Sequence, residues 1–321
     1  MRALYFDGEQ PSLVDRDEPT RSAETAIVRT TFAGVCNTDL EVAKGYMGFR
    51  GTLGHELVGE VVDGPDAWLG RRVVSEINFA CGHCDMCAAG LGRHCPTRRV
   101  MGILEADGAF AEFVQVPVAN LHGVPDNVSD TAAAFTEPLA AAFEILEQVD
   151  IEAGQHAVVL GDGKLGLLIA QVLATTGAKV LAVGKHPAKL GILEARDIET
   201  MLASDFDPRS SHQPLADLVV DATGSSDSLT RAIAATRPRG TLALKTTVAE
   251  EHRIDLSPIV VNEIQLLGSR CGLFEPALNA LNSHEVDTTQ LIEATLPLSQ
   301  APKALERASR RGALKVLIEC G

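Results

Sequence analysis

The first 125 residues alternate hydrophobic and polar positions over short stretches rich in Gly, Val and Thr. Runs such as Ala26–Thr31, Leu57–Val62 and Phe110–Val116 each have the length of a single strand. Apolar residues at every second position are typical of strands that bury one face. This part of the chain therefore predicts a largely antiparallel β region.

Near Pro138 the pattern changes, and helices begin to alternate with continuous apolar strands. Pro138 suits the first turn of a helix, and good helix formers continue from Leu139 to Leu146. The strands expected after it are Ala157–Leu160, Val180–Val183, Leu218–Val220, Leu242–Leu244 and Ile264–Leu267, and the intervening helices include Leu165–Ala174 and Pro187–Arg196. Such strands indicate a parallel sheet covered on both faces.

The last part of the chain, from about Leu273, returns to a mixed pattern. It predicts helices at Pro276–Leu281 and Ala301–Arg310 and a terminal strand at Leu314–Ile318. With 321 residues, 45% of them hydrophobic, the chain is long enough for two domains.

Charge and cysteine content narrow the class of protein. The net charge of −15 argues against nucleic acid or an anionic membrane as the main partner. The start of the chain turns polar too early for a secretory signal, and no apolar run approaches the roughly 18 residues of a membrane span. The seven cysteines fit a reducing compartment, so we expect a cytoplasmic protein.

Four of these cysteines form a closely spaced group. Cys81, Cys84 and Cys87 are each separated by two residues, and Cys95 follows after seven more. A tetrahedral Zn²⁺ binds four thiolates at about 2.3 Å and tolerates short, irregular loops between them. We therefore expect a structural zinc in a lobe that spans about residues 78–98.

A glycine-rich loop indicates a dinucleotide. The sequence Gly161-Asp-Gly163-Lys164-Leu165-Gly166 follows a predicted strand and opens a predicted helix. In this context Gly161 allows a tight turn, Gly163 lets the backbone approach a pyrophosphate, and Gly166 lets helix and strand pack closely. The alternative is a glycine-rich turn without a ligand.

The end of the next strand bears on which dinucleotide binds. An acidic residue there would bind the ribose 2′-hydroxyl of NAD, but the chain has Gly184-Lys185-His186. The room at Gly184 and the charge of Lys185 favour the 2′-phosphate of NADP, whereas a solvated turn that binds NAD is the alternative. Further candidate cofactor contacts, most of which follow strands whose carboxyl ends line the crevice, are Lys189, Thr223, Gly224, Thr246, Ser269 and Arg270.

A second group of potential zinc ligands is spread along the chain. It comprises Cys36 with Thr38 and Asp39 close behind it, the pair His55-Glu56, and Glu137. A cysteine, a histidine and a carboxylate can form an open zinc site that leaves a position for water or substrate. Taken singly, each has an ordinary alternative: a core thiol, a satisfied histidine or a carboxylate at a helix N-terminus.

With these motifs in this order, the chain resembles the zinc-containing medium-chain alcohol dehydrogenases over essentially its full length. Glu137-Pro138-Leu139 is similar to the branch of polyol, threonine and glucose dehydrogenases. The resemblance implies an α/β protein in which a doubly wound Rossmann domain (139–272) is inserted into a mainly β, GroES-like catalytic domain (1–138 and 273–321). It also implies an active site in the cleft between these domains.

The resemblance further implies roles for the individual residues. Cys36 and His55 would bind a catalytic zinc, and Glu56 or Glu137 would complete the ligation. Asp39 would hold the His55 tautomer, and Thr38 would hydrogen-bond the substrate oxygen and pass its proton outward. Cys81, Cys84, Cys87 and Cys95 would carry the structural zinc, which makes two zinc ions per chain. Liver-type members place a relay histidine where this chain has Glu41.

The function expected from the resemblance is a zinc-dependent oxidoreductase. It would transfer a hydride between an alcohol (a secondary alcohol, polyol or sugar) and NADP or NAD, as a homodimer or homotetramer. The alternatives are a zinc-independent enone or quinone reductase of the same superfamily, a non-catalytic protein that binds zinc and nucleotide, and a structural protein that uses only the cysteine lobe.

Overall fold

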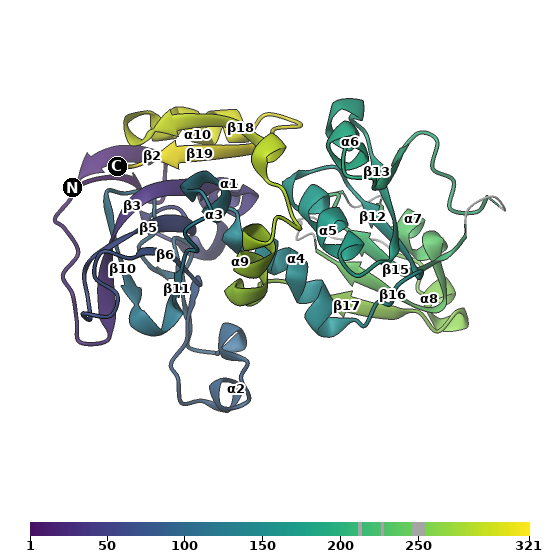
Figure 1. Ribbon diagram of the computed structural model, residues 1–321, viewed down its shortest axis with the longest axis horizontal. Coiled ribbons are helices and arrows are strands. Elements are labelled where there is room, and N and C mark those ends of the chain that lie inside the picture. The colour runs from purple at the N-terminus through teal and green to yellow at the C-terminus, as the bar shows by residue number, and fades with distance from the viewer. Residues whose placement is uncertain (211–213, 226–227, 246–253) are drawn as a thin grey trace. The chain divides into compact units, whose positions relative to one another are not determined.

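Two units make up the chain in the computed structural model, which describes residues 1–210, 214–225, 228–245 and 254–321. The first unit comprises Met1–Glu137, Phe274–Asn282 and Thr288–Gly321, and the second comprises Pro138–Leu273 and Ser283–Asp287. The second unit therefore interrupts the first along the sequence, as the colours in Figure 1 show.

The central element of the first unit is the eleven-residue strand β3 (Thr25–Val35). It belongs to a seven-stranded sheet with the order β11-β6-β5-β3-β19-β18, in which β10 also pairs with β3. The other strands are β5 (Glu56–Asp63), β6 (Arg72–Ser75), β10 (Phe113–Pro117), β11 (Leu121–Gly123), β18 (Ile292–Pro297) and β19 (Lys315–Glu319). β3 is long enough to pair with β10 along its first half and with β19 along its second half.

Shorter elements complete this unit. One small sheet has the order β2-β1-β4 and another the order β7-β8-β9. Their strands are β1 (Arg2–Phe6), β2 (Pro11–Asp15), β4 (Gly51–Thr52), β7 (Asn78–Phe79), β8 (Arg99–Met101) and β9 (Glu105–Ala106). The α-helices are α1 (Asn37–Val42), α2 (Asp85–Ala88), α3 (Asp130–Ala133), α9 (Phe274–Asn282) and α10 (Ala301–Ala308). The 3₁₀ turns are η1 (Tyr46–Gly48), η2 (Gly92–His94), η3 (Val118–Asn120), η4 (Thr289–Leu291) and η5 (Leu298–Gln300).

The predicted antiparallel β region is confirmed, with one boundary error. The run predicted at Phe110–Val116 starts as a strand only at Phe113. The backbone of Phe110 instead donates to the Leu53 carbonyl and accepts from the Leu4 amide, so it does not join the ladder with β3. The sequence pattern also did not predict β18 (Ile292–Pro297), whose residues alternate between partly buried and exposed, with none fully buried.

The second unit contains six parallel strands in the order β14-β13-β12-β15-β16-β17. Numbered within the unit, this order is 3-2-1-4-5-6, which is that of a doubly wound dinucleotide-binding sheet. The strands are β12 (His156–Leu160), β13 (Lys179–Gly184), β14 (Glu199–Leu202), β15 (Ala216–Asp221), β16 (Thr236–Leu244) and β17 (Gln265–Gly268). The expected Rossmann sheet is therefore confirmed, and β14 is an addition that the sequence pattern did not predict.

Helices pack on this sheet in two pairs, α5 with α6 and α7 with α8 (Figure 1). Their bounds, with that of the preceding α4, are α4 (Thr136–Gln148), α5 (Lys164–Ala174), α6 (Pro187–Glu194), α7 (Ser228–Ala235) and α8 (Ser257–Val261). Val158, Val219 and Leu242 from three neighbouring strands form part of the core that α7 covers.

None of the described helices has the length and apolar character that crossing a bilayer requires. A span needs about 20 residues, and α4, one of the longer helices, has 13.

Gly59 in β5 provides a test of how closely β3 and β5 pack. A Cβ atom on Gly59 would lie 2.2 Å from the carbonyl oxygen of Arg29, so the two strands would have to separate. We expect Gly59→Ala to lower the free energy of unfolding by about 1–3 kcal/mol. Gly123→Ala in β11 is the control, because a Cβ there meets open space. Thermal or urea unfolding of both variants measures the difference, and equal stability would contradict the close packing.

Candidate active site and metal centre

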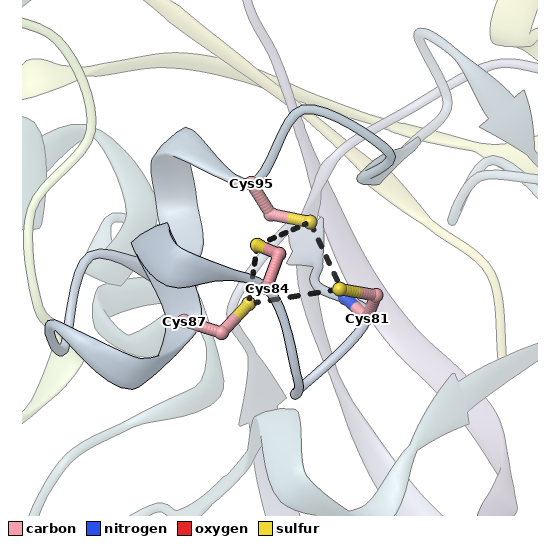
Figure 2. A group of neighbouring side chains, drawn as sticks. All are labelled: Cys81, Cys84, Cys87 and Cys95. Atoms are coloured by element: carbon pink, nitrogen blue, oxygen red, sulfur yellow. Dashed lines mark hydrogen bonds between the residues drawn. The ribbon is translucent and has the colours of Figure 1, made fainter.

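Four thiols converge in the lobe that carries α2 (Figure 2). Cys84 precedes α2, Cys87 lies within it, Cys81 follows β7 and Cys95 follows η2. The Sγ atom of Cys84 lies 3.5 Å from that of Cys87 and 3.8 Å from that of Cys95. The Sγ atom of Cys81 lies 4.0 Å from that of Cys87. Four ligands at about 2.3 Å in a tetrahedron place their sulfurs roughly 3.8 Å apart. The geometry of this group therefore fits zinc.

The electrostatics of this group point the same way. The backbone amide of His83 lowers the pKa of the Cys81 thiol to about 5. The amide of Cys87 also acts to lower the pKa of Cys84, but burial and the neighbouring sulfurs outweigh it and raise that pKa to about 11. Four sulfurs this close cannot all be thiolates unless a cation compensates their negative charge, and a bound metal ion would be such a cation.

A second group of donor atoms forms where strands of the first unit meet. The ligand atoms of Cys36, His55 and Glu56 all lie within 4.8 Å of one another. Cys36 directly follows β3, and His55 directly precedes β5. Since these strands are antiparallel and pair Gly34 with Glu56, the end of one lies beside the start of the other. Residues nearly 20 positions apart in sequence are thus brought together by strand register.

Asp39 fixes two of these donors. It is fully buried on α1, its Oδ2 accepts the backbone N–H of Cys36 at 2.8 Å, and its Oδ1 lies 3.0 Å from Nδ1 of His55. Burial acts to lower the pKa of His55, but the charge and hydrogen bond of Asp39, with help from Cys36, raise it well above its ordinary value. With Nδ1 held by Asp39, Nε2 is the ring nitrogen left to bind a metal.

Lys315 is a site residue that the sequence did not reveal. It begins β19, is 1% exposed, and its Nζ donates to both carboxylate oxygens of Glu56, at 2.5 Å to Oε1. Burial acts to lower the pKa of Lys315, but Glu56 and Cys36 outweigh it and raise that pKa. Gly34 makes room for this pair, because a Cβ there would lie 1.9 Å from Oε2 of Glu56. The one sequence signal that could have pointed to Lys315 is that it is a charged residue within the otherwise apolar strand predicted at Leu314–Ile318.

The remaining residues predicted for this site lie close by. The Thr38 hydroxyl is 3.7 Å from Sγ of Cys36. Glu137 lies in the first turn of α4, and its charge acts on Lys315, although it is not in the group formed by Cys36, His55 and Glu56. Glu41, at the position of the relay histidine of liver-type enzymes, forms an exposed ion pair with Lys44.

The glycine loop of the second unit connects β12 to α5. Gly161 has φ +117°, and a Cβ there would lie 2.6 Å from the carbonyl oxygen of Ala222. A Cβ on Gly166 would lie 2.0 Å from the carbonyl oxygen of Gly161, whereas one on Gly163 would meet open space. Lys164 and Leu165 are the first residues of α5, so the backbone amides at the N-terminus of this helix directly follow the glycine loop. These features fit the pyrophosphate of a dinucleotide.

The other residues predicted to contact the cofactor have different surroundings. Thr223 and Gly224 follow β15, and the Thr223 hydroxyl donates to Asp221 at 2.8 Å. Ser269 and the carbonyl of Arg270 follow β17, and both accept from Lys245. Lys189 is buried on α6, and Gly184, Lys185 and His186 connect β13 to α6. Thr246 lies outside the described residues.

One carboxylate beside the end of β13 was not predicted. Asp162, the second residue of the glycine loop, accepts hydrogen bonds from the backbone amides of Lys185 and His186. The sequence shows an aspartate at this position but does not say where its side chain points, because the glycine motif assigns no role to the residue between its first two glycines.

Comparison with known proteins places both units. The family model of the alcohol dehydrogenase GroES-like domain matches residues 22–126, and that of the zinc-binding dehydrogenases matches residues 165–283. A sorbitol dehydrogenase of Halalkalibacterium halodurans is 30% identical over 323 residues, which cover 95% of this chain and 94% of the relative.

Solved structures are similar over the same extent. An alcohol dehydrogenase of E. coli CFT073 in complex with NADH has a TM-score of 0.91 and 25% identity, with 99% of each chain covered. A zinc-binding dehydrogenase of Sinorhizobium meliloti 1021 bound to NADP has a TM-score of 0.89 and 25% identity, with 99% of this chain and 98% of that chain covered.

The donor groups, the glycine loop and these full-length similarities agree with one another. The chain belongs to the zinc-type medium-chain alcohol dehydrogenases, in their polyol dehydrogenase branch.

Proposed function

We propose that this protein is a zinc-dependent oxidoreductase that transfers a hydride between NAD(P) and the carbinol carbon of a polyol, sugar or other secondary alcohol. The observation that carries the proposal is the open donor group of Cys36, His55 and Glu56 in a chain that also has a dinucleotide loop. An open zinc site and a nicotinamide cofactor are the two components that this reaction requires.

The donor set suits a catalytic zinc. A thiolate, an imidazole and a carboxylate are ordinary protein ligands of this ion, and three of them leave one position open. Cys36 and His55 would hold the ion together with a carboxylate from Glu56 or Glu137. When bound, the zinc supplies a Lewis acid for the substrate oxygen, and the nicotinamide supplies the hydride acceptor or donor.

The side chains of this chain have their own tasks in the reaction. Asp39 holds His55 in one tautomer and fixes the backbone of Cys36, so the donors keep their geometry during turnover. The Thr38 hydroxyl, close to Cys36, hydrogen-bonds the substrate oxygen and relays the alcohol proton, receiving it as it gives up its own proton to solvent. Glu41, exposed and paired with Lys44, cannot act as the relay histidine does, so the proton leaves Thr38 by another route.

The alternatives fit the donor group less well. A zinc-independent enone or quinone reductase has no use for Cys, His and carboxylate donors within 4.8 Å of one another, of which the His and the carboxylate are buried. A protein that only binds zinc and nucleotide has no need of the Thr38 hydroxyl beside Cys36. One that relies on the cysteine lobe alone needs neither Thr38 nor the buried Asp39 that holds His55.

We also propose a homo-oligomer of two or four subunits in the cytoplasm. β17 ends its sheet, and the adjoining apolar side chains of Leu256, Val260, Val261 and Leu266 are between 44% and 78% exposed. An apolar strand edge of this kind is suited to self-association. All seven cysteines, each in the described part of the chain, are free thiols, which suits a reducing compartment.

The direct test is an activity screen of the zinc-loaded protein with polyols, aldoses, sugar acids, amino alcohols and aryl alcohols, each with NAD and with NADP. We expect oxidation of at least one polyol or sugar, seen as absorbance of the reduced nicotinamide. Prior removal of zinc with a chelator should abolish the activity, and added zinc should restore it. Reduction of enones by zinc-free protein, with no alcohol oxidised, would overturn the proposal.

The two zinc sites are separated by one matched pair of variants, each a cysteine-to-serine change. Cys36→Ser should remove about one zinc per chain and lower kcat/KM at least about a hundredfold, because the Lewis acid is lost. Its melting temperature should stay close to that of the wild type. Elemental analysis, kinetics and thermal unfolding measure these three quantities.

Cys84→Ser should differ from Cys36→Ser in its effect on stability. It removes the other zinc and lowers the melting temperature, because a structural metal site contributes its binding free energy to folding. Loss of the same zinc by both variants, or a single zinc in the wild type, would contradict two separate sites.

Thr38 tests the proposed proton transfer. Thr38→Val keeps the shape of the side chain but removes the hydroxyl, so kcat should fall about 10²–10⁴-fold with the zinc content unchanged. Thr38→Ser retains the hydroxyl and should keep most of the activity. If valine and serine behave alike, the Thr38 hydroxyl does not carry the proton.

A further inference from the structure

The second unit holds a carboxylate at the place where dinucleotide-binding sheets distinguish NAD from NADP. This place is the end of the second strand, here β13, where an acidic residue ordinarily binds the ribose 2′-hydroxyl. No acidic residue follows Gly184 in the sequence, since Lys185 and His186 come next. In the fold, however, Asp162 reaches this point from the glycine loop, 23 residues before Lys185.

The Asp162 carboxylate makes close contacts here. Its Oδ2 accepts the backbone N–H of Lys185 at 2.7 Å and that of His186 at 2.6 Å, and it lies 2.9 Å from Nδ1 of His186. Asp162 is only 8% exposed. Burial acts to raise its pKa, but the His186 amide and ring and the Lys185 amide outweigh this and bring it below the ordinary value. The carboxylate is therefore ionised at neutral pH.

The absence of a side chain at Gly184 leaves the space that the Asp162 side chain fills. A Cβ on Gly184 would lie 2.5 Å from Cβ of Asp162 and 2.7 Å from its Oδ2. The space that the sequence offered to a 2′-phosphate is thus filled by a negatively charged side chain. The two amides next to it, which could have bound a phosphate, already donate to that side chain.

We propose that Asp162 is the specificity-determining residue of this dinucleotide site and that it selects against the 2′-phosphate of NADP. It occupies the amide pair of Lys185 and His186 and places a negative charge where the phosphate would lie. The inference rests on the proposed use of a dinucleotide and deepens it. The prediction of NADP from the room at Gly184 and the charge of Lys185 did not include this carboxylate, which fills the room, opposes the charge of Lys185 and favours NAD.

The experiment compares the binding of adenosine 5′-monophosphate and adenosine 2′,5′-bisphosphate, which differ only by the 2′-phosphate. Calorimetry gives the two dissociation constants for the wild type and for Asp162→Asn. Asparagine keeps an oxygen for the amides but loses the charge. We expect the ratio of affinities to shift toward the 2′-phosphorylated ligand by about tenfold or more, because one like-charge repulsion is removed. Titration with NADH and NADPH should show the same shift.

Asp217→Asn is the matched control. Asp217 also accepts a backbone amide, that of His156, and pairs with a basic side chain, Arg237. It lies at the start of β15, toward the opposite end of the parallel strands from Gly184. Its loss of charge should leave the affinity ratio unchanged. Asp162→Ser, which lacks the charge but retains a hydroxyl acceptor, is the second variant and should shift the ratio in the same direction as Asp162→Asn.

An affinity ratio that stays within about twofold of the wild type in folded Asp162 variants would overturn the assignment, because a purely structural aspartate has no reason to distinguish the two ligands. These measurements do not depend on hydride transfer or on zinc. If the wild type bound neither adenosine phosphate, the dinucleotide site of the proposed function would itself be wrong. If both adenosine phosphates bind but the Asp162 variants leave the ratio of their affinities unchanged, only the proposed role of Asp162 is wrong.

Discussion

The antiparallel pairing of β3 with β5 and β19 is the constraint on which the candidate active site depends. The register places Gly34 opposite Glu56 and Val35 opposite Val316. The residues just beyond these pairs, Cys36, His55 and Lys315, are thereby gathered at one end of a buried sheet. A slip of one residue would turn every side chain of a strand to the other face. The same hydrogen bonds that stabilise the sheet therefore also position the donors.

Charge is arranged around this point with little access to water. Glu56 and Lys315 are both buried and pair with each other, and Asp39 is buried against His55. Burying unpaired charges is costly, so each carboxylate is matched by a cation or by hydrogen-bond donors. Lys315 therefore compensates the negative charge of the Glu56 carboxylate. This arrangement links the charge of Glu56 to a residue at the far end of the sequence.

Glycines in both units make room for charged or polar groups of neighbouring segments. Gly34 leaves space for the Glu56 carboxylate, Gly166 for the carbonyl of Gly161, and Gly184 for the Asp162 side chain. In each case a Cβ atom would overlap the neighbour, so the requirement is steric and not only one of backbone freedom. The cysteine lobe differs, because its thiols converge through short loops around one point and need little from the rest of the fold.

Local signals in the sequence determined much of this protein. The spacing of Cys81, Cys84, Cys87 and Cys95 predicted a cluster that the structure forms, and the alternation of apolar strands with helices predicted a parallel sheet. Both signals lie in residues that are close together in the chain. Only the tertiary structure decided the partners of Glu56 and of the end of β13. Lys315 lies 259 residues from Glu56, and the amides that Asp162 accepts from come 23 and 24 residues later, after α5 and β13. Such contacts follow from strand order and register, which no short stretch of sequence encodes.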